Sequence, residues 1–234
     1  MGYKGRLNVG ELIAVYVPII ILTPFYCYYK AVSQHQTKPY PYTTITNTAC
    51  FYSQNIAFRY FMLIASSILA LTFFMMFKWV SKVAADSGFP RPISQVLYYF
   101  SMFSILLYGI TIGTIDGKGT GSLHSPCAVG FFVILIWSII EMTLYMTEMR
   151  DYDSRTISKT SLRCKQLLAA YLVILWVYCI VMIIAVSTDE EIEGKSDKYV
   201  DIVEWNTVTV GLLWVLTFYW EWKQMNLVLV DPSG

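Results

Sequence analysis

The sequence predicts an all-α, polytopic membrane protein in which six transmembrane helices form one bundle with both termini in the cytosol. Hydrophobic residues make up 56% of the 234 residues and only 14% are charged, against about 25% charged residues in an average soluble domain. Six stretches are long and apolar enough to cross a bilayer, since a helix needs roughly 20 apolar residues to span the hydrocarbon. Lys and Arg are also unevenly divided between the two sets of connections. Together these observations exclude an ordinary soluble enzyme and a disordered chain.

The six expected spans cover residues 12–29, 56–77, 97–115, 128–146, 167–187 and 206–222. These stretches lack the alternation of barrel strands, and backbone groups in lipid must be bonded within their own segment, so each span is expected to be a helix. No internal repeat is evident. Residues 1–234 are therefore expected to form a single integral membrane domain.

The distribution of basic residues predicts the orientation of the bundle. Connections on the side of the N-terminus carry eleven Lys and Arg, the opposite connections carry five, and Arg59 lies inside the second span. The positive-inside rule then places both termini in the cytosol. The overall charge of +1 provides no field that attracts nucleic acid, and no nucleic-acid partner is expected.

Three polar side chains are expected near the outer membrane boundary: Arg59 in the second span, His124 at the start of the fourth, and Glu204 at the mouth of the sixth. A charge within the bilayer costs on the order of 2.5 to 3.5 kcal/mol, so it is paired or turned inward. Arg59 is either an anchor that reaches lipid phosphates or a ligand contact. His124 is either a polar residue at a helix start or the best single candidate for chemistry, because imidazole changes charge near neutral pH.

A polar stripe follows one face of the fourth span, with Ser138, Glu141 and Tyr145 spaced three and four residues apart. Together with Tyr108 of the third span, they are expected to form an intramembrane hydrogen-bond network. A proton relay is the alternative, although a relay normally needs several ionisable groups within the membrane.

Two glycines of the third span, Gly109 and Gly113, are four residues apart. Small residues at this spacing let helix backbones approach closely within a membrane. The pair therefore predicts close packing inside the bundle, with a dimer face as the weaker alternative.

Of the five cysteines, Cys50 and Cys127 both fall on the expected outer side. They are the preferred disulfide pair, which would contribute about 4 kcal/mol to stability by the chain-entropy model. The two histidines lack the spacing of metal ligands, so no metal site and no cofactor are expected. No catalytic constellation is recognisable, and the sequence leaves enzymatic activity open.

Several segments resemble, in order, one family of six-helix membrane proteins. They are residues 41–45 (PYTTI), residues 53–59 (SQNIAFR), the pattern HxxxAxxFF that begins at His124, and the dipeptide Glu204-Trp205. The family groups the damage-regulated autophagy modulator, the FGF-receptor-activating protein (a post-GPI-attachment factor) and the suppressor-of-four-kinase proteins. The resemblance covers nearly the whole chain. It implies lipid-linked work in membranes: remodelling the lipid of GPI anchors, influencing lipid distribution or modulating autophagy.

Two functions follow as alternatives. In the first, the protein handles membrane lipids, and Arg59, His124 and Glu204 contact a lipid headgroup, with GPI-anchored proteins as further partners. In the second, it is a noncatalytic accessory subunit of a larger membrane complex. An ion-coupled transporter is least favoured, because only Arg59 and Glu141 lie clearly within spans. The expected location is the endomembrane system (ER, Golgi or lysosome) or the plasma membrane.

Overall fold

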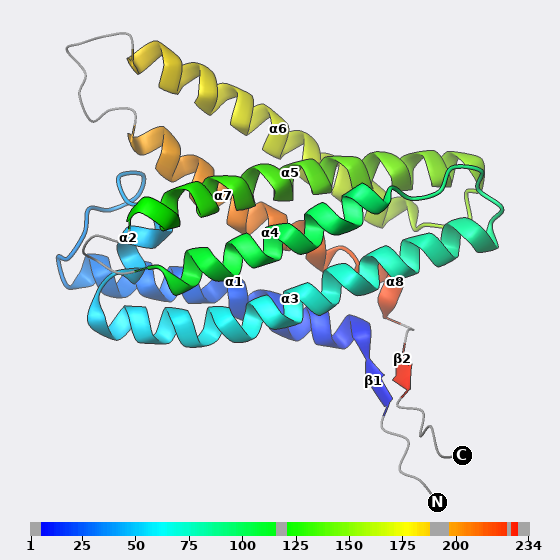
Figure 1. Cartoon of the computed structure of the whole chain (residues 1–234), viewed down its shortest axis with the longest axis horizontal. Coiled ribbons are helices and arrows are strands. Elements are labelled where there is room, and N and C mark those ends of the chain that lie inside the picture. Colours follow the sequence, from blue (N-terminus) through cyan, green and yellow to red (C-terminus); the bar gives the residue numbers. More distant parts are fainter. Residues whose placement is uncertain (1–5, 116–120, 188–196, 224–225, 229–234) are drawn as a thin grey trace, which may run out of the picture.

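The structure, a computed structural model, describes residues 6–115, 121–187, 197–223 and 226–228 (Figure 1). Its elements are, in chain order, β1 (Arg6–Asn8), α1 (Val9–Ser33), α2 (Ile45–Ala49), α3 (Tyr52–Asp86), α4 (Gln95–Gly113), α5 (Gly121–Tyr152), α6 (Lys159–Ser187), α7 (Asp197–Leu216), α8 (Tyr219–Trp222) and β2 (Asn226–Val228).

Among the described residues, six helical segments are long and apolar enough to cross a membrane. The predicted all-α fold with six spans is therefore confirmed, and the protein is an integral membrane protein. Most helices run beyond the predicted limits; α3, for example, has 35 residues. The sixth span differs more, because a turn at Thr217 and Phe218 divides it into α7 and α8.

The helices run back and forth along one bundle axis, so the connections gather at two ends (Figure 1). We call the end that holds α2 the α2 end, and the end near both chain termini the terminal end. At the terminal end β1 pairs antiparallel with β2, with Asn8 opposite Asn226. The first and last described elements therefore lie on the same side, as six spans require. That this side is the cytosol stays a prediction from the charge distribution.

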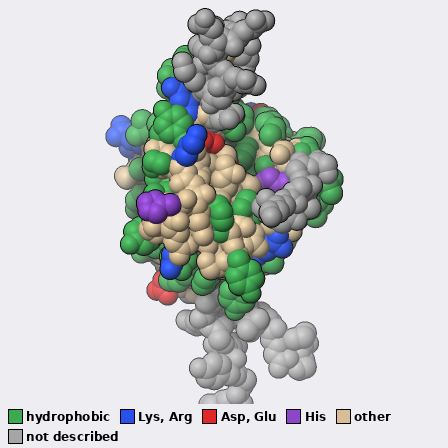
Figure 2. Space-filling model, turned by 90° about the vertical axis from the view of Figure 1, so that its left-hand side faces the viewer, with side chains coloured by type: hydrophobic (Ala, Val, Ile, Leu, Met, Phe, Trp, Pro, Cys, Tyr) green, Lys and Arg blue, Asp and Glu red, His purple; other side chains and the backbone are tan. Residues whose placement is uncertain are grey.

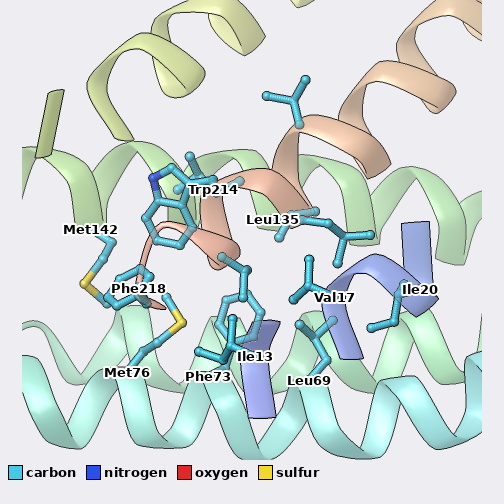
Figure 3. Close-up of a cluster of buried hydrophobic side chains, with 14 of the residues drawn as sticks. Ile13, Val17, Ile20, Leu69, Phe73, Met76, Leu135, Met142, Trp214 and Phe218 are labelled. Carbon is cyan, nitrogen blue, oxygen red and sulfur yellow. The ribbon is translucent and has the colours of Figure 1, made fainter. Parts of the chain in front are cut away.

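Apolar side chains from α1, α3, α5 and α7 fill the centre of the bundle (Figure 3). Ile13 and Val17 of α1 face Leu69 and Phe73 of α3 in this cluster, and Trp214 of α7 lies to one side of them, toward Met142. Helix α6 contributes least, since many of its apolar side chains are exposed. An apolar outer face of this kind is typical of a helix that spans a membrane.

Figure 1 shows α6 slanting away from α5 toward the α2 end, where α7 lies beside it. A cavity lined by residues of α5, α6 and α7 lies at the α2 end and holds the candidate site.

The close packing predicted at Gly109 and Gly113 is wrong within the bundle. A Cβ added at either glycine would meet no atom within 4 Å. The close approach occurs instead at Gly10 of α1, where an added Cβ would lie 2.7 Å from the Cα of Lys223.

Candidate functional site

The short helix α2 is fixed against α7 at the α2 end. Thr44 caps α2 by accepting a hydrogen bond from the Asn47 backbone N–H at 2.9 Å. Just before it, the carbonyl of Thr43 accepts from Trp205 Nε1 of α7 at 2.8 Å. Both partners of this second bond are buried, so the bond holds α2 in one position. Thr46 of α2 is thereby placed between α5 and α7.

Thr46 joins two of the predicted site residues. Its Oγ1 lies 3.0 Å from His124 Nε2 and 3.4 Å from Glu204 Oε1, and its backbone N–H donates to the same carboxylate oxygen at 3.3 Å. The other imidazole nitrogen, His124 Nδ1, lies 2.9 Å from the carbonyl oxygen of Thr111. We call His124, Thr46 and Glu204 the HTE cluster.

These contacts determine where the protons of the HTE cluster reside. A carbonyl oxygen only accepts, so His124 Nδ1 carries the proton that binds Thr111 O. In neutral His124, Nε2 then accepts from the Thr46 hydroxyl. With one further proton, Nε2–H donates to Thr46 and Thr46 donates to Glu204, so both links are made at once. Thr46 therefore connects His124 to Glu204 through one hydroxyl group.

The HTE cluster forms the polar end of a cavity of about 450 Å³, which Asn47 and Ser125 also line. This volume falls within the range of roughly 300 to 1,000 Å³ that is typical of small-molecule sites. The apolar walls come from three helices and include Val129 and Phe132 of α5, Trp176 and Ile180 of α6, and Val200 and Val203 of α7. The division into a polar end and apolar walls matches an amphiphilic ligand.

Figure 2 views the α2 end from outside. Histidine (purple) and several Lys or Arg side chains (blue) appear on this face, separated by polar and apolar side chains.

Arg59 is at the same end of the bundle but binds elsewhere. Its Nη2 donates to the carbonyl of Ile115, just beyond the end of α4, and Asn55 Nδ2 donates to the same oxygen at 3.0 Å. Since carbonyl groups at a helix C-terminus carry partial negative charge, this is a favourable position for a cation. His124 binds Thr111 O one turn earlier in α4. The structure thus brings His124 and Glu204 together, whereas Arg59 is not among the residues that line their cavity.

We expect Arg59→Met to weaken the fold without emptying the cavity. A hydrogen bond from a charged donor contributes about 1.5 to 3 kcal/mol, so the free energy of unfolding in detergent should fall by about that amount. Lipid retained by the purified variant should equal that of the wild type. The reverse result, with stability kept and lipid lost, would assign Arg59 to the ligand.

The model of one protein family, described as the Frag1/DRAM/Sfk1/Cwh43P N-terminal domain, matches residues 9–225. The chain belongs to this family. The match includes all six spans and every residue of the HTE cluster, and it confirms the resemblance drawn from the sequence. No curated protein and no solved structure gives a significant match to this Frag1/DRAM family chain.

The predicted intramembrane network is divided between several places in the Frag1/DRAM family chain. Ser138 accepts from Ser101 Oγ at 3.2 Å, and Tyr145 donates to the Arg91 carbonyl at 2.8 Å. Tyr108 contacts the sulfur of Met62 at 3.7 Å. Glu141 is half-buried on the same helix as Ser138 and Tyr145. The first two contacts join α5 to α4 and to the α3–α4 connection, and the third joins α4 to α3, so they serve helix packing.

The disulfide predicted between Cys50 and Cys127 is not formed. Cys50 follows α2, and its thiol donates to the Thr46 carbonyl at 3.0 Å, one turn back along its own chain.

The terminal end holds a buried ion pair that sequence analysis missed. Lys165 Nζ of α6 lies 3.3 Å from Glu221 Oε2 of α8, and it also donates to Ser161 Oγ at 2.6 Å. The ammonium group lies 4.0 Å from the centre of the Phe218 ring. Lys165 is one of the eleven basic residues counted in the connections on the side of the N-terminus. Glu221 is 56 residues away, a separation that no helical spacing reveals.

Proposed function

We propose that this Frag1/DRAM family protein handles membrane lipids by holding one lipid in the cavity between α5, α6 and α7. The headgroup would bind at the HTE cluster, and a hydrocarbon chain would lie along the apolar walls. The observation that carries the proposal is the division of one cavity into a hydrogen-bonding end and an apolar remainder. Lipid is the amphiphile available to such a cavity in a membrane.

The position of α6 supports access from the bilayer. This helix forms one wall of the cavity and exposes apolar side chains outward, among them Val177 and Ile184. A lipid would therefore enter from the hydrocarbon region without crossing the polar surface. By the positive-inside rule the cluster belongs to the noncytosolic side, where GPI-anchored proteins are attached. Remodelling of GPI-anchor lipid, or regulation of the lipid composition of that leaflet, is the cellular role we assign.

The proposal is tested by filling the cavity. We expect Val203→Trp to lower the lipid that copurifies with the protein, measured by native mass spectrometry, to a small fraction of the wild-type amount. The matched control is Thr209→Trp. Thr209 lies on the same helix but lines a separate cavity of about 370 Å³ beside Phe25 and Trp205. The control should retain lipid at the wild-type level.

The cellular arm compares the lipid composition of GPI-anchored proteins in cells that carry only one variant. Val203→Trp should change that composition, and Thr209→Trp should not. Two results contradict the proposal: equal lipid retention in both variants, or a wild-type protein that purifies without lipid but always with a second protein. The latter would favour the accessory-subunit function.

A further inference from the structure

The polar end of the cavity differs from an anion site in its charge. Of the described residues that line it, Glu204 is acidic, and none is a lysine or an arginine. Arg59, the cation that the sequence predicts for this site, donates to the Ile115 carbonyl instead. A phosphate placed here would meet a carboxylate without a fixed positive partner.

The imidazole of His124, the remaining basic group, already has hydrogen-bond partners within the protein. Both of its ring nitrogens are engaged, Nδ1 with Thr111 O and Nε2 with Thr46 Oγ1. The Thr46 backbone N–H is used as well, because it donates to Glu204. An incoming anion would therefore find the strongest donors of the cluster already occupied.

The HTE cluster has two proton states. With one extra proton, shared between His124 and Glu204 through Thr46, the cluster carries no net charge. Without it, the cluster carries one negative charge. Neither state is positive, and like charges juxtaposed in a partly desolvated site disfavour binding.

Neutral hydrogen-bonding groups complete the polar end. Asn47 and Ser125 are both exposed residues that line the cavity, and they offer an amide and a hydroxyl. An alcohol both donates and accepts, so it is suited to a carboxylate that accepts and to an amide that donates. The lining groups thus complement a headgroup with hydroxyls and no charge.

We infer that the lipid held in this cavity has an uncharged, hydroxyl-bearing head, as diacylglycerol has, and that lipids with a phosphate head are excluded. This inference rests on the proposed function, because it names the class of lipid that the cavity takes. It assigns Glu204 the role of specificity determinant: its carboxylate accepts from the lipid hydroxyl and repels phosphate.

The test uses two lipids that differ only at the head. Purified full-length protein in detergent is offered equimolar dioleoylglycerol and dioleoyl phosphatidic acid, and bound lipid is counted by native mass spectrometry. We expect dioleoylglycerol to be bound at least about tenfold more than phosphatidic acid, a ratio equal to about 1.4 kcal/mol.

The variant Glu204→Gln removes the charge and keeps an oxygen that accepts from Thr46. We expect it to bring the ratio of the two lipids to within about threefold, which is less than 1.4 kcal/mol. The matched control is Glu148→Gln, which removes an exposed carboxylate that pairs with Arg91 far along α5. The control should keep the wild-type ratio.

The outcomes separate this inference from the proposed function. Wild-type protein that binds phosphatidic acid as well as dioleoylglycerol, or better, overturns the inference and leaves the proposed function standing. Binding of neither lipid overturns both. An unchanged ratio in Glu204→Gln refutes the role of Glu204, and the wild-type ratio decides the lipid class even where this variant does not fold.

Discussion

Replacing Glu221 by alanine should lower the free energy of unfolding by about 3 to 5 kcal/mol, because it leaves a buried charge without its partner. The Lys165 side chain is 0% exposed and that of Glu221 is 3% exposed, so water does not replace the lost carboxylate. Ser161 and the Phe218 ring remain, but neither neutralises an ammonium group. Equilibrium unfolding in mixed detergent micelles would measure the loss.

The double variant Lys165→Met with Glu221→Leu is the control for this prediction. It removes both charges and fills similar volume with apolar atoms, a change that is often neutral or stabilising for a buried pair. We expect it to recover most of the stability that Glu221→Ala loses. Glu148→Ala, in the exposed pair with Arg91, should change the unfolding free energy little. A double variant as unstable as Glu221→Ala would show that the pair is needed for more than charge balance.

The ion pair is also linked by hydrogen bonds to the turn that divides the last span into α7 and α8. Lys165 binds Ser161, and Ser161 Oγ donates to the carbonyl of Thr217 at 3.1 Å, in the turn between α7 and α8. That turn contains neither Gly nor Pro, so no local signal predicted it. Its partners come from α6, a separate part of the chain.

The six spans, in contrast, were predictable from the sequence. Each span is a continuous apolar run. Backbone N–H and C=O groups in lipid must form hydrogen bonds within their own segment, so such a run folds as a helix. The ends of the helices were less predictable. In α3 the helix continues through Lys78 and Lys82, because polar residues outside the hydrocarbon do not stop helical hydrogen bonding.

The candidate site was predicted in part. His124 and Glu204 were identified because polar residues are costly at the membrane boundary, and the structure places them around one hydroxyl. Thr46 carries no such cost and lies in a run of threonines, so nothing in its spacing distinguished it from Thr44. Arg59 was identified for the same reason, but the sequence does not reveal that its guanidinium group binds the Ile115 carbonyl just beyond the end of α4.

A second large effect is expected at Gly10, where α1 touches the end of the chain. Asn8 caps α1 and also donates from Nδ2 to the Lys223 carbonyl at 2.9 Å, which brings the two segments together. A Cβ added at Gly10 would lie 2.7 Å from Lys223 Cα and 3.0 Å from the Trp222 carbonyl carbon. These are backbone atoms, which cannot swing away as a side chain does. Gly10→Ala should therefore lower the free energy of unfolding by about 1 to 3 kcal/mol, and Gly10→Val by more.

The control for Gly10 is the same substitution at Gly109. An added Cβ there meets no atom within 4 Å, and alanine is a better helix former than glycine by up to about 1 kcal/mol. Gly109→Ala should leave the free energy of unfolding unchanged or raise it slightly. The two variants make the same chemical change in helices of the same bundle. If the free energy of unfolding falls in Gly10→Ala and does not fall in Gly109→Ala, the backbone contact at Gly10 is the cause. Equal destabilisation would instead indicate a glycine-dependent contact at Gly109, such as a dimer face, that one protomer does not contain.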